Sequence, residues 1–214
     1  MICVLGCLDT CRGLRICNEM KTRLGKYHKI FEVHQNPPGA EFEYPAIYYA
    51  LHIALDANSP VLYLHTKGSG NAIPLNYKDA HMSSRVKFPA DAVPEDCQKI
   101  VRLMWYNEFC SDRLTYYLNA VNTSEPTMAC PMCGVTRTTW HNGWIINSSG
   151  AKELLKTFHK DKNRYYYETM PQQCRLLKLK SILMPDWDDS HVDASVQMWN
   201  VIWKFYDNSI KQLV

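Results

Sequence analysis

The chain has 214 residues, of which 46% are hydrophobic and 21% charged, and its 24 basic and 21 acidic residues leave a formal charge of +3. This composition is typical of a globular protein and argues against disorder, and so small a charge gives no support for nucleic-acid binding. No run of about 18 apolar residues occurs, so we predict no membrane span.

The first third of the chain alternates between short apolar runs and amphipathic stretches. We expect strands at 2–8, 29–34 and 61–65, and helical stretches that end near residue 24 and cover 43–57. Strands that alternate with helices in this way predict a parallel sheet built from βαβ units.

The remainder of the chain opens with a long, turn-rich connection at 69–94, and connections of that length in compact domains are usually functional or disordered. A long helical pattern follows at 95–121. Further on we expect strands at 127–135, 145–146 and 180–184, a helix to about residue 159 capped by Ser148 or Ser149, and a closing amphipathic helix at 196–213.

The nine cysteines are odd in number and irregularly spaced, so they form no visible disulfide framework. We expect reduced thiols and a cytoplasmic protein. Cys130 and Cys133 form half of a zinc-binding pattern, but a structural zinc needs a second pair, and His141 and Cys110 lack the usual spacing.

The end of the third predicted strand is the most informative stretch. Val61 to Leu64 indicate a buried strand, and His65, Thr66, Lys67 and Gly68 follow at once. Ligands in open α/β sheets bind at the carboxyl ends of strands, so an imidazole, a hydroxyl, an ammonium and a glycine there favour an anion or nucleotide site. The alternative is a loop whose polar residues have no such role.

The segment 62–68 resembles the HTKG motif of small glycosyltransferases of polysaccharide and rhamnan synthesis. The later segment 140–146 resembles a second motif of that family, and 99–118, with Arg102 and Trp105, resembles its connecting helix. The likeness covers about residues 40–170. The chain also resembles the N-terminal glycosyltransferase domains that chlorella viruses use in capsid-glycan synthesis, which implies a location in the host cytoplasm.

The resemblance implies a GT-A fold for residues 1–214, a Rossmann-like mixed and mostly parallel sheet flanked by helices. It also implies transfer of a hexose or rhamnose from a UDP-sugar to a glycan or glycoprotein acceptor, with Mn²⁺ or Mg²⁺. One departure is clear, because that fold usually has Asp-x-Asp where this chain has His65, Thr66 and Lys67. The alternative function is a non-catalytic nucleotide-sugar or glycan-binding module of a larger synthase.

The expected site residues follow from this fold. Asp79 and His81, a carboxylate and an imidazole two residues apart, are the expected metal ligands, and His191 is a further possible ligand. The residues expected to bind the nucleotide-sugar are Leu8, Asp9, Thr10, Arg12, His34, His65, Thr66, Lys67, His141, Asn142 and Trp144.

An inverting transferase needs a general base to remove the acceptor proton. The candidates are Glu168, which follows a run of three tyrosines, and the acidic group of Asp186, Asp188 and Asp189. We expect Glu168 and Asp188 to be catalytic, the alternative for Glu168 being a solvent-facing helix carboxylate. A retaining enzyme would need no such base, and the sequence does not decide the stereochemistry.

Overall fold

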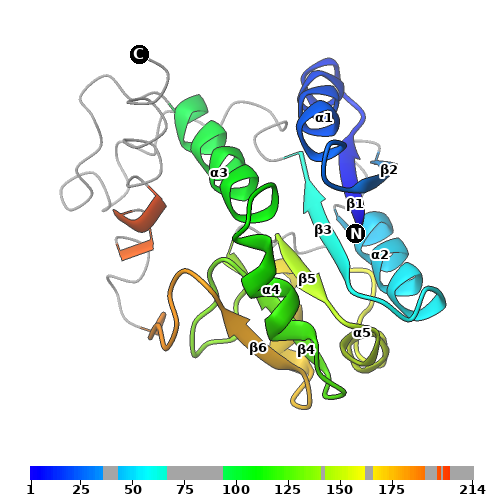
Figure 1. The fold of residues 1–214 in the computed structure, drawn as a ribbon, viewed down its shortest axis with the longest axis vertical. Helices are drawn as coiled ribbons and strands as arrows, with labels where there is room; N and C mark the ends of the chain where they lie inside the picture. The colour runs from blue at the N-terminus through cyan, green and yellow to red at the C-terminus, as the bar shows by residue number, and fades with distance from the viewer. Residues whose placement is uncertain are drawn as a thin grey trace.

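The computed structural model describes residues 1–35, 43–66, 94–140, 143–161, 166–190, 197–198 and 200–202, with only the backbone given for 35 and 94–100. These residues form a six-stranded sheet of order β2-β1-β3-β5-β4-β6 (Figure 1). Its strands are β1 (Ile2–Leu8), β2 (Lys29–Gln35), β3 (Val61–His65), β4 (Thr127–Cys130), β5 (Trp144–Ile146) and β6 (Lys178–Ser181). Only β5 is antiparallel to its neighbours, which confirms a mixed, mostly parallel sheet.

Helices flank both faces of this sheet. The helices are α1 (Cys11–Leu24), α2 (Tyr44–Asp56), α3 (Pro94–Phe109), α4 (Leu114–Val121), α5 (Ser148–Leu155) and α6 (Tyr166–Thr169), and a 3₁₀ turn, η3 (Met170–Gln173), follows α6. One hydrophobic core lies under α1, α3 and α4, and a second lies under α2, α5 and α6. The sheet is therefore the middle layer of three (Figure 1).

The sequence explains this layering through the two periodicities of the backbone. Successive side chains of a strand point to opposite faces, so Leu5 of β1 enters the first core and Val4 the second. On α1 the buried residues include Ile16 and Met20, four apart on one face. The first three strands and the helices between them lie where the sequence predicts them.

The single helix predicted at 95–121 is wrong, because the chain breaks between α3 and α4. Ser111 Oγ donates to the carbonyl of Asn107 and accepts at 3.2 Å from the amide of Arg113. Serine often competes with the helical backbone in this way. The break also brings Arg113 Nε within 2.6 Å of the fully buried Glu108.

Other element ends differ from the prediction as well. The strand expected at 127–135 stops at Cys130, directly before Pro131, and the last strand begins at Lys178 rather than residue 180. The N-cap of α5 is Asn147, whose Oδ1 accepts from the amide of Gly150 at 2.8 Å, and not a serine. Most of the closing helix expected at 196–213 lies outside the described residues, although Ile202 is buried.

The cysteines differ from the expectation of reduced thiols in one place. Cys7 of β1 and Cys17 of α1 form a disulfide, with their Cα atoms 5.8 Å apart. The reason is that α1 folds back onto β1 and places two residues ten positions apart against each other. The other cysteines whose side chains are described are free thiols: Cys3, Cys11, Cys110, Cys130, Cys133 and Cys174.

Within the described part of the chain, no helix has both the length and the apolar character that a membrane crossing requires.

Candidate functional site

The carboxyl ends of five strands meet at one edge of the sheet. β1, β2, β3, β4 and β6 run parallel, and β5 runs the other way, so it begins at this same edge. In the sheet β2 lies on one side of β1 and β3 lies on its other side, so the strand order reverses after β2. In open α/β sheets this change of direction between neighbouring strands, here β1 and β3, is where ligands bind.

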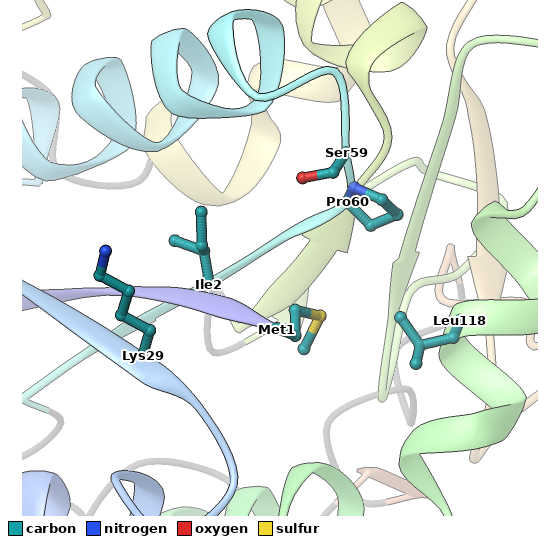
Figure 2. Close-up of a pocket in the computed structure, with 6 residues that line it drawn as sticks. All are labelled: Met1, Ile2, Lys29, Ser59, Pro60 and Leu118. Carbon is teal, nitrogen blue, oxygen red and sulfur yellow. The ribbon is translucent and has the colours of Figure 1, made fainter.

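The opposite edge carries a pocket of about 410 Å³ near the start of the chain (Figure 2). Its lining residues are Met1, Ile2, Lys29, Ser59, Pro60 and Leu118. The lining is mainly apolar and brings one amine but no carboxylate or imidazole, so it offers little for catalysis. The chemistry lies at the carboxyl edge instead.

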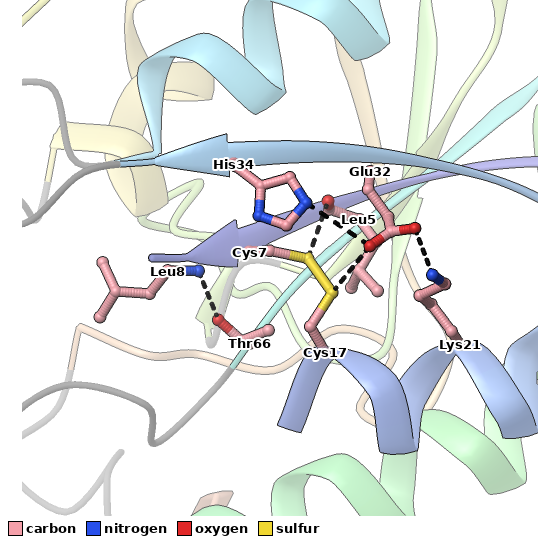
Figure 3. Close-up of a disulfide and its surroundings, with 8 residues drawn as sticks. All are labelled: Leu5, Cys7, Leu8, Cys17, Lys21, Glu32, His34 and Thr66. Carbon is pink, nitrogen blue, oxygen red and sulfur yellow. Dashed lines mark hydrogen bonds and ion pairs between the residues drawn. A yellow bond between two sulfur atoms is a disulfide. The ribbon is translucent and has the colours of Figure 1, made fainter. Parts of the chain in front are cut away.

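Thr66 lies directly after β3 and is 6% exposed. Its amide donates to the carbonyl of Gly6 at 2.9 Å, and its hydroxyl accepts from the amide of Leu8 at 3.1 Å (Figure 3). Thr10 caps α1 by accepting from the amide of Gly13 at 2.9 Å. The hydroxyls of these two predicted ligand-binding residues therefore hold the end of β1 and the start of α1 in place.

Gly13 allows α1 to begin directly beside the end of β1. A Cβ atom at this position would lie 2.0 Å from the carbonyl oxygen of Leu8, closer than any real contact. The amino end of α1, where the positive end of the helix dipole lies, is thus held beside the carboxyl end of β1. Such helix ends bind phosphate groups.

His65 forms a pair with a residue that the sequence reasoning missed. Its Nδ1 lies 2.8 Å from Glu43 Oε1, and Glu43 Oε2 accepts from the hydroxyl of Tyr63 at 3.2 Å. Burial first and then the Glu43 charge raise the pKa of Tyr63. Glu43 directly precedes α2, and this position is the only sequence signal that could have marked it as a site residue.

Two buried nitrogens near the end of β3, His65 Nε2 and Trp105 Nε1, have no hydrogen-bond partner among the described residues. Their rings are 5.6 Å apart between centroids. In the neutral ring with Nδ1–H donating to Glu43, Nε2 of His65 carries a lone pair, whereas Trp105 Nε1 is a donor only. One acceptor beside one donor suits a hydroxyl group, which can both donate and accept.

A buried arginine of α3 interacts with charged side chains along α1, from Arg12 to Glu19. Arg102 of α3 is 8% exposed, and burial lowers the pKa of its guanidinium. The positive charges of Arg12 and Arg15 lower this pKa further, whereas the negative charge of Glu19 raises it. α1 and α3 are in contact. Arg102 and Arg12 were noted from the sequence, but Arg15 was missed; its spacing of three from Arg12, which places both on one helix face, could have revealed it.

In the acidic segment after β6, the side chain of Asp189 is buried and that of Asp188 is exposed. Asp189 is 7% exposed, and it accepts from the amide of Thr136 at 2.7 Å, from the Thr136 hydroxyl, and from Trp140 Nε1 at 3.0 Å. Asp188 is exposed, and its Oδ1 accepts from the amide of Ser190 at 3.0 Å. Asp189 therefore fastens the loop after β4 to the segment after β6.

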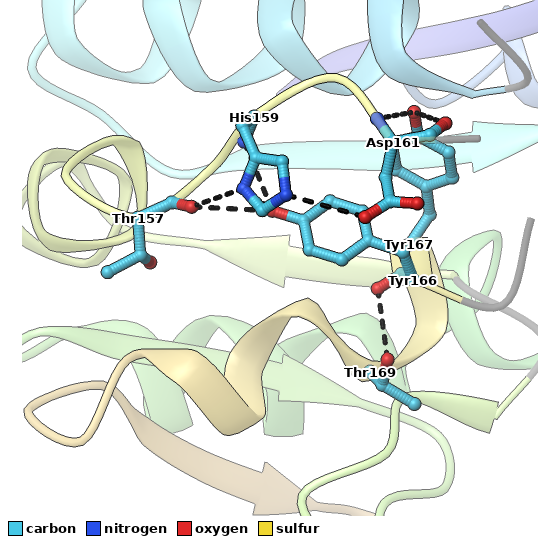
Figure 4. A network of polar contacts seen from close by, with 6 residues as sticks. All are labelled: Thr157, His159, Asp161, Tyr166, Tyr167 and Thr169. Carbon is cyan, nitrogen blue, oxygen red and sulfur yellow. Dashed lines mark hydrogen bonds and ion pairs between the residues drawn. The ribbon is translucent and has the colours of Figure 1, made fainter. Parts of the chain in front are cut away.

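Glu168 lies on α6, partly buried, and its backbone carbonyl accepts from the amide of Thr139 at 2.7 Å. Of the tyrosines before it, Tyr167 donates to the carbonyl of Asp161 at 3.1 Å, and Tyr166 accepts from the amide of His159 at 3.1 Å (Figure 4). Both side chains are buried and hold the segment after α5 in place.

Two further predicted residues lie in β5 and β2. Trp144 is fully buried and packs on Tyr63 with centroids 4.8 Å apart, so its indole has no exposed surface for a ligand. His34, near the end of β2, is 49% exposed, with Nε2 3.6 Å from Glu32. The predicted residues that lie outside the described ranges are Lys67, Asp79, His81, His141, Asn142 and His191.

In the part of the chain that the structure describes, one group of three or more metal-type donors occurs, Cys7, Cys17 and Glu32. Its two sulfurs are joined in the disulfide, and it lacks the oxygen-rich donor set that Mn²⁺ and Mg²⁺ prefer.

No protein-family model, curated protein or solved structure matches this chain. The function must therefore be argued from the site itself.

Proposed function

We propose that this protein is a metal-dependent glycosyltransferase of GT-A type that moves a hexose or rhamnose from a UDP-sugar to a glycan hydroxyl. The observation that carries the proposal is the amino end of α1, held against β1 at the point between β1 and β3 where the strand order reverses. Arg12 and Arg15 lie in the first two turns of this helix, and the charge of the buried Arg102 of α3 interacts with theirs. A helix end and guanidinium groups together suit a diphosphate.

In this proposal the arginines neutralise the charge that develops on the diphosphate when the sugar leaves. A divalent cation would act as Lewis acid and template for the same oxygens. The buried Arg102 supplies a charge whose field is little screened by water.

His65 and Trp105 would contact a hydroxyl of the donor sugar or the acceptor. Glu43 fixes the ring of His65 through Nδ1, which leaves Nε2 to accept a proton or a hydrogen bond. Trp105 Nε1 would donate to the same hydroxyl oxygen. This arrangement explains two buried nitrogens that otherwise lack a partner among the described residues.

The experiment is to incubate the purified chain with UDP-sugars and Mn²⁺ and to measure release of UDP, which EDTA should abolish. Arg12→Gln should weaken UDP binding by about tenfold, the effect of losing one charge-assisted contact. Lys26→Gln, which removes the same charge beyond the far end of α1, is the matched control. Unchanged binding in Arg12→Gln, or no binding of any UDP-sugar by the parent, contradicts the proposal.

A second candidate is a binding module without turnover. The observation that favours it is that Asp189, the inward carboxylate of the acidic segment, accepts three hydrogen bonds from the loop it fastens. In that case the parent should bind UDP-sugars without releasing UDP. Full loss of turnover in Glu168→Gln, with binding unchanged, would instead identify a base and exclude the module.

A further inference from the structure

The sulfurs of Cys7 and Cys17 are buried between β1, α1 and β2, and each lies near one oxygen atom (Figure 3). Cys17 Sγ is 3.5 Å from Glu32 Oε2, and Cys7 Sγ is 3.6 Å from the carbonyl oxygen of Leu5. A disulfide has no proton to donate to these oxygens. Thiols could donate to them, and thiolates would need a cation beside the carboxylate. The surroundings therefore suit the reduced pair better than the oxidised one.

The same place gathers the donor atoms of a metal site. One sulfur from each of Cys7 and Cys17 and one carboxylate oxygen of Glu32 all lie within 4.8 Å of one another. His34 pairs with Cys7 in the sheet, so both side chains point to the face that α1 covers, and its Nε2 is 3.6 Å from Glu32 Oε2.

The two oxygens of Glu32 have separate partners. Oε1 lies 2.5 Å from the ammonium of Lys21, while Oε2 faces Cys17 and His34. Lys21 thus holds the carboxylate in place without occupying the oxygen that faces the sulfurs. The His34 side chain is 49% exposed, so its ring can turn toward a cation.

We propose that the reduced Cys7–Cys17 pair binds a thiophilic divalent cation of the zinc type, with Glu32 and His34 as the other two ligands. Two thiolates, an imidazole and a carboxylate are all ordinary zinc ligands, and four of them complete a tetrahedral site. Soft sulfur donors select against Mg²⁺ and Mn²⁺. This site is distinct from the metal of the proposed glycosyl transfer and does not depend on that function.

Reduction must precede binding, because the S–S bond and the metal bonds compete for the same sulfurs. A dithiol reductant supplies two electrons and two protons, the S–S bond breaks, two thiols form, and the dithiol becomes its own disulfide. Zinc then displaces the two thiol protons to solvent. The sulfurs end roughly 3.8 Å apart when each Zn–S bond is about 2.3 Å, so the oxidised and metal-bound states exclude each other.

The test uses the full chain, reduced with dithiothreitol, freed of reductant without oxygen, and titrated with Zn²⁺ and with Co²⁺ as a coloured probe. We expect the reduced protein to bind one equivalent of metal, and Co²⁺ at this site to give a thiolate-to-cobalt charge-transfer band. The oxidised protein should not bind this equivalent. Cys17→Ser should lose this equivalent, and Glu32→Gln should bind about tenfold more weakly or worse. Cys11→Ser, an exposed cysteine on the same helix, should bind like the parent.

Equal metal uptake and equal spectra for the reduced parent and Cys17→Ser would overturn the proposal, because the metal would then lie elsewhere, for example at Cys130 and Cys133. If Cys17→Ser does not fold, as judged by circular dichroism, Glu32→Gln and His34→Gln decide the question. These two positions are partly exposed, at 27% and 49% of the side chain, so neither change disturbs a core. Parental affinity in both variants would refute the ligand set.

Discussion

Buried polar side chains in this protein are held by partners far away in the sequence. Asp189 bonds to Thr136 across 53 positions, and Asn147 Nδ2 donates to the carbonyls of Val121, Thr123 and Glu125. A buried polar group is costly unless it is paired. Single residues of this kind therefore decide how the loops after β4 and β6 are fixed at the carboxyl edge.

Asp189→Ala should destabilise the protein, because it leaves the Thr136 amide and Trp140 Nε1 without their acceptor. Hydrogen bonds to a charged group contribute about 1.5–3 kcal/mol each in net terms, so we expect a loss of roughly 2–4 kcal/mol in the free energy of unfolding. Urea denaturation measures it. The exposed neighbour Asp188→Ala should change stability by no more than about 0.5 kcal/mol; equal losses at both positions would contradict the assignment.

His28 should make stability fall in mild acid. It is buried, its Nε2 lies 2.7 Å from the carbonyl of Phe109, and burial lowers its pKa. In the unfolded chain the pKa of this histidine is near 6.5, so as the pH falls the unfolded chain binds the proton before the folded one does. The contribution of the neutral His28 to folding stability is therefore complete above about pH 6.5 and is lost below it.

The measurement for His28 compares urea unfolding of the parent and of His28→Gln at about pH 7.5 and about pH 5.5, on either side of that pKa. Glutamine can still donate to the Phe109 carbonyl but does not titrate. The parent should lose more stability than the variant between the two conditions. An equal loss would mean that other groups carry the pH dependence.

At the scale of elements, the start of α1 is defined by its close approach to β1. Gly13→Ala would place a methyl group against the carbonyl of Leu8, and overpacking of this kind costs about 1–3 kcal/mol. Helix propensity alone predicts a gain of up to about 1 kcal/mol from the same change. The sign of the change in unfolding free energy, measured by denaturation, therefore separates the two effects. As a control, Asn18→Ala at an exposed position of the same helix should change stability very little.

The disulfide fastens the same two elements. It closes a short loop, since Cys7 and Cys17 are ten positions apart, and loops near that length contribute about 2–3 kcal/mol in the chain-entropy account. Dithiothreitol should lower the melting temperature of the parent and leave Cys7→Ser/Cys17→Ser unchanged. A parent insensitive to reductant would show that the bond adds nothing to stability.

At the scale of the whole molecule, a ligand that binds only the folded chain raises the unfolding free energy. UDP at about 100 times its dissociation constant would add about 2.7 kcal/mol, or roughly 5–10 °C in melting temperature for a chain of this size. Differential scanning fluorimetry measures the shift, and Arg12→Gln should reduce it at equal UDP concentration. No shift with UDP or UDP-sugars would count against the proposed nucleotide site.

The sequence could predict some strands of the sheet and their direction, but not all of them. β1, β2 and β3 are apolar runs bounded by helical patterns, so their positions and parallel direction followed from local signals. β5 is three residues long and shows no periodicity, and its antiparallel direction is set by β3 and β4 on either side. The sequence predicted a strand at 145–146, but its direction depends on tertiary contacts that no local pattern encodes.

The site divides in the same way. Strand ends predicted that Thr10, His65 and Thr66 would gather at one edge, because that follows from parallel topology. Glu43 could not be paired with His65 in advance, since it reaches the end of β3 only through the packing of α2. The inward turn of Asp189 and the outward turn of Asp188 likewise depend on where the loop after β4 lies.

Among the described strands β6 is outermost beside β4, and this has a consequence for self-association. An edge strand offers free amides and carbonyls on which another polypeptide can add as an extra strand. Lys178 and Lys180 of β6 are both exposed. The Nζ of Lys178 is already paired with Glu125, 2.5 Å from its Oε2, so a second chain meeting this border would face the charge of Lys180. A lysine on an edge strand disfavours the addition of another strand along the sheet.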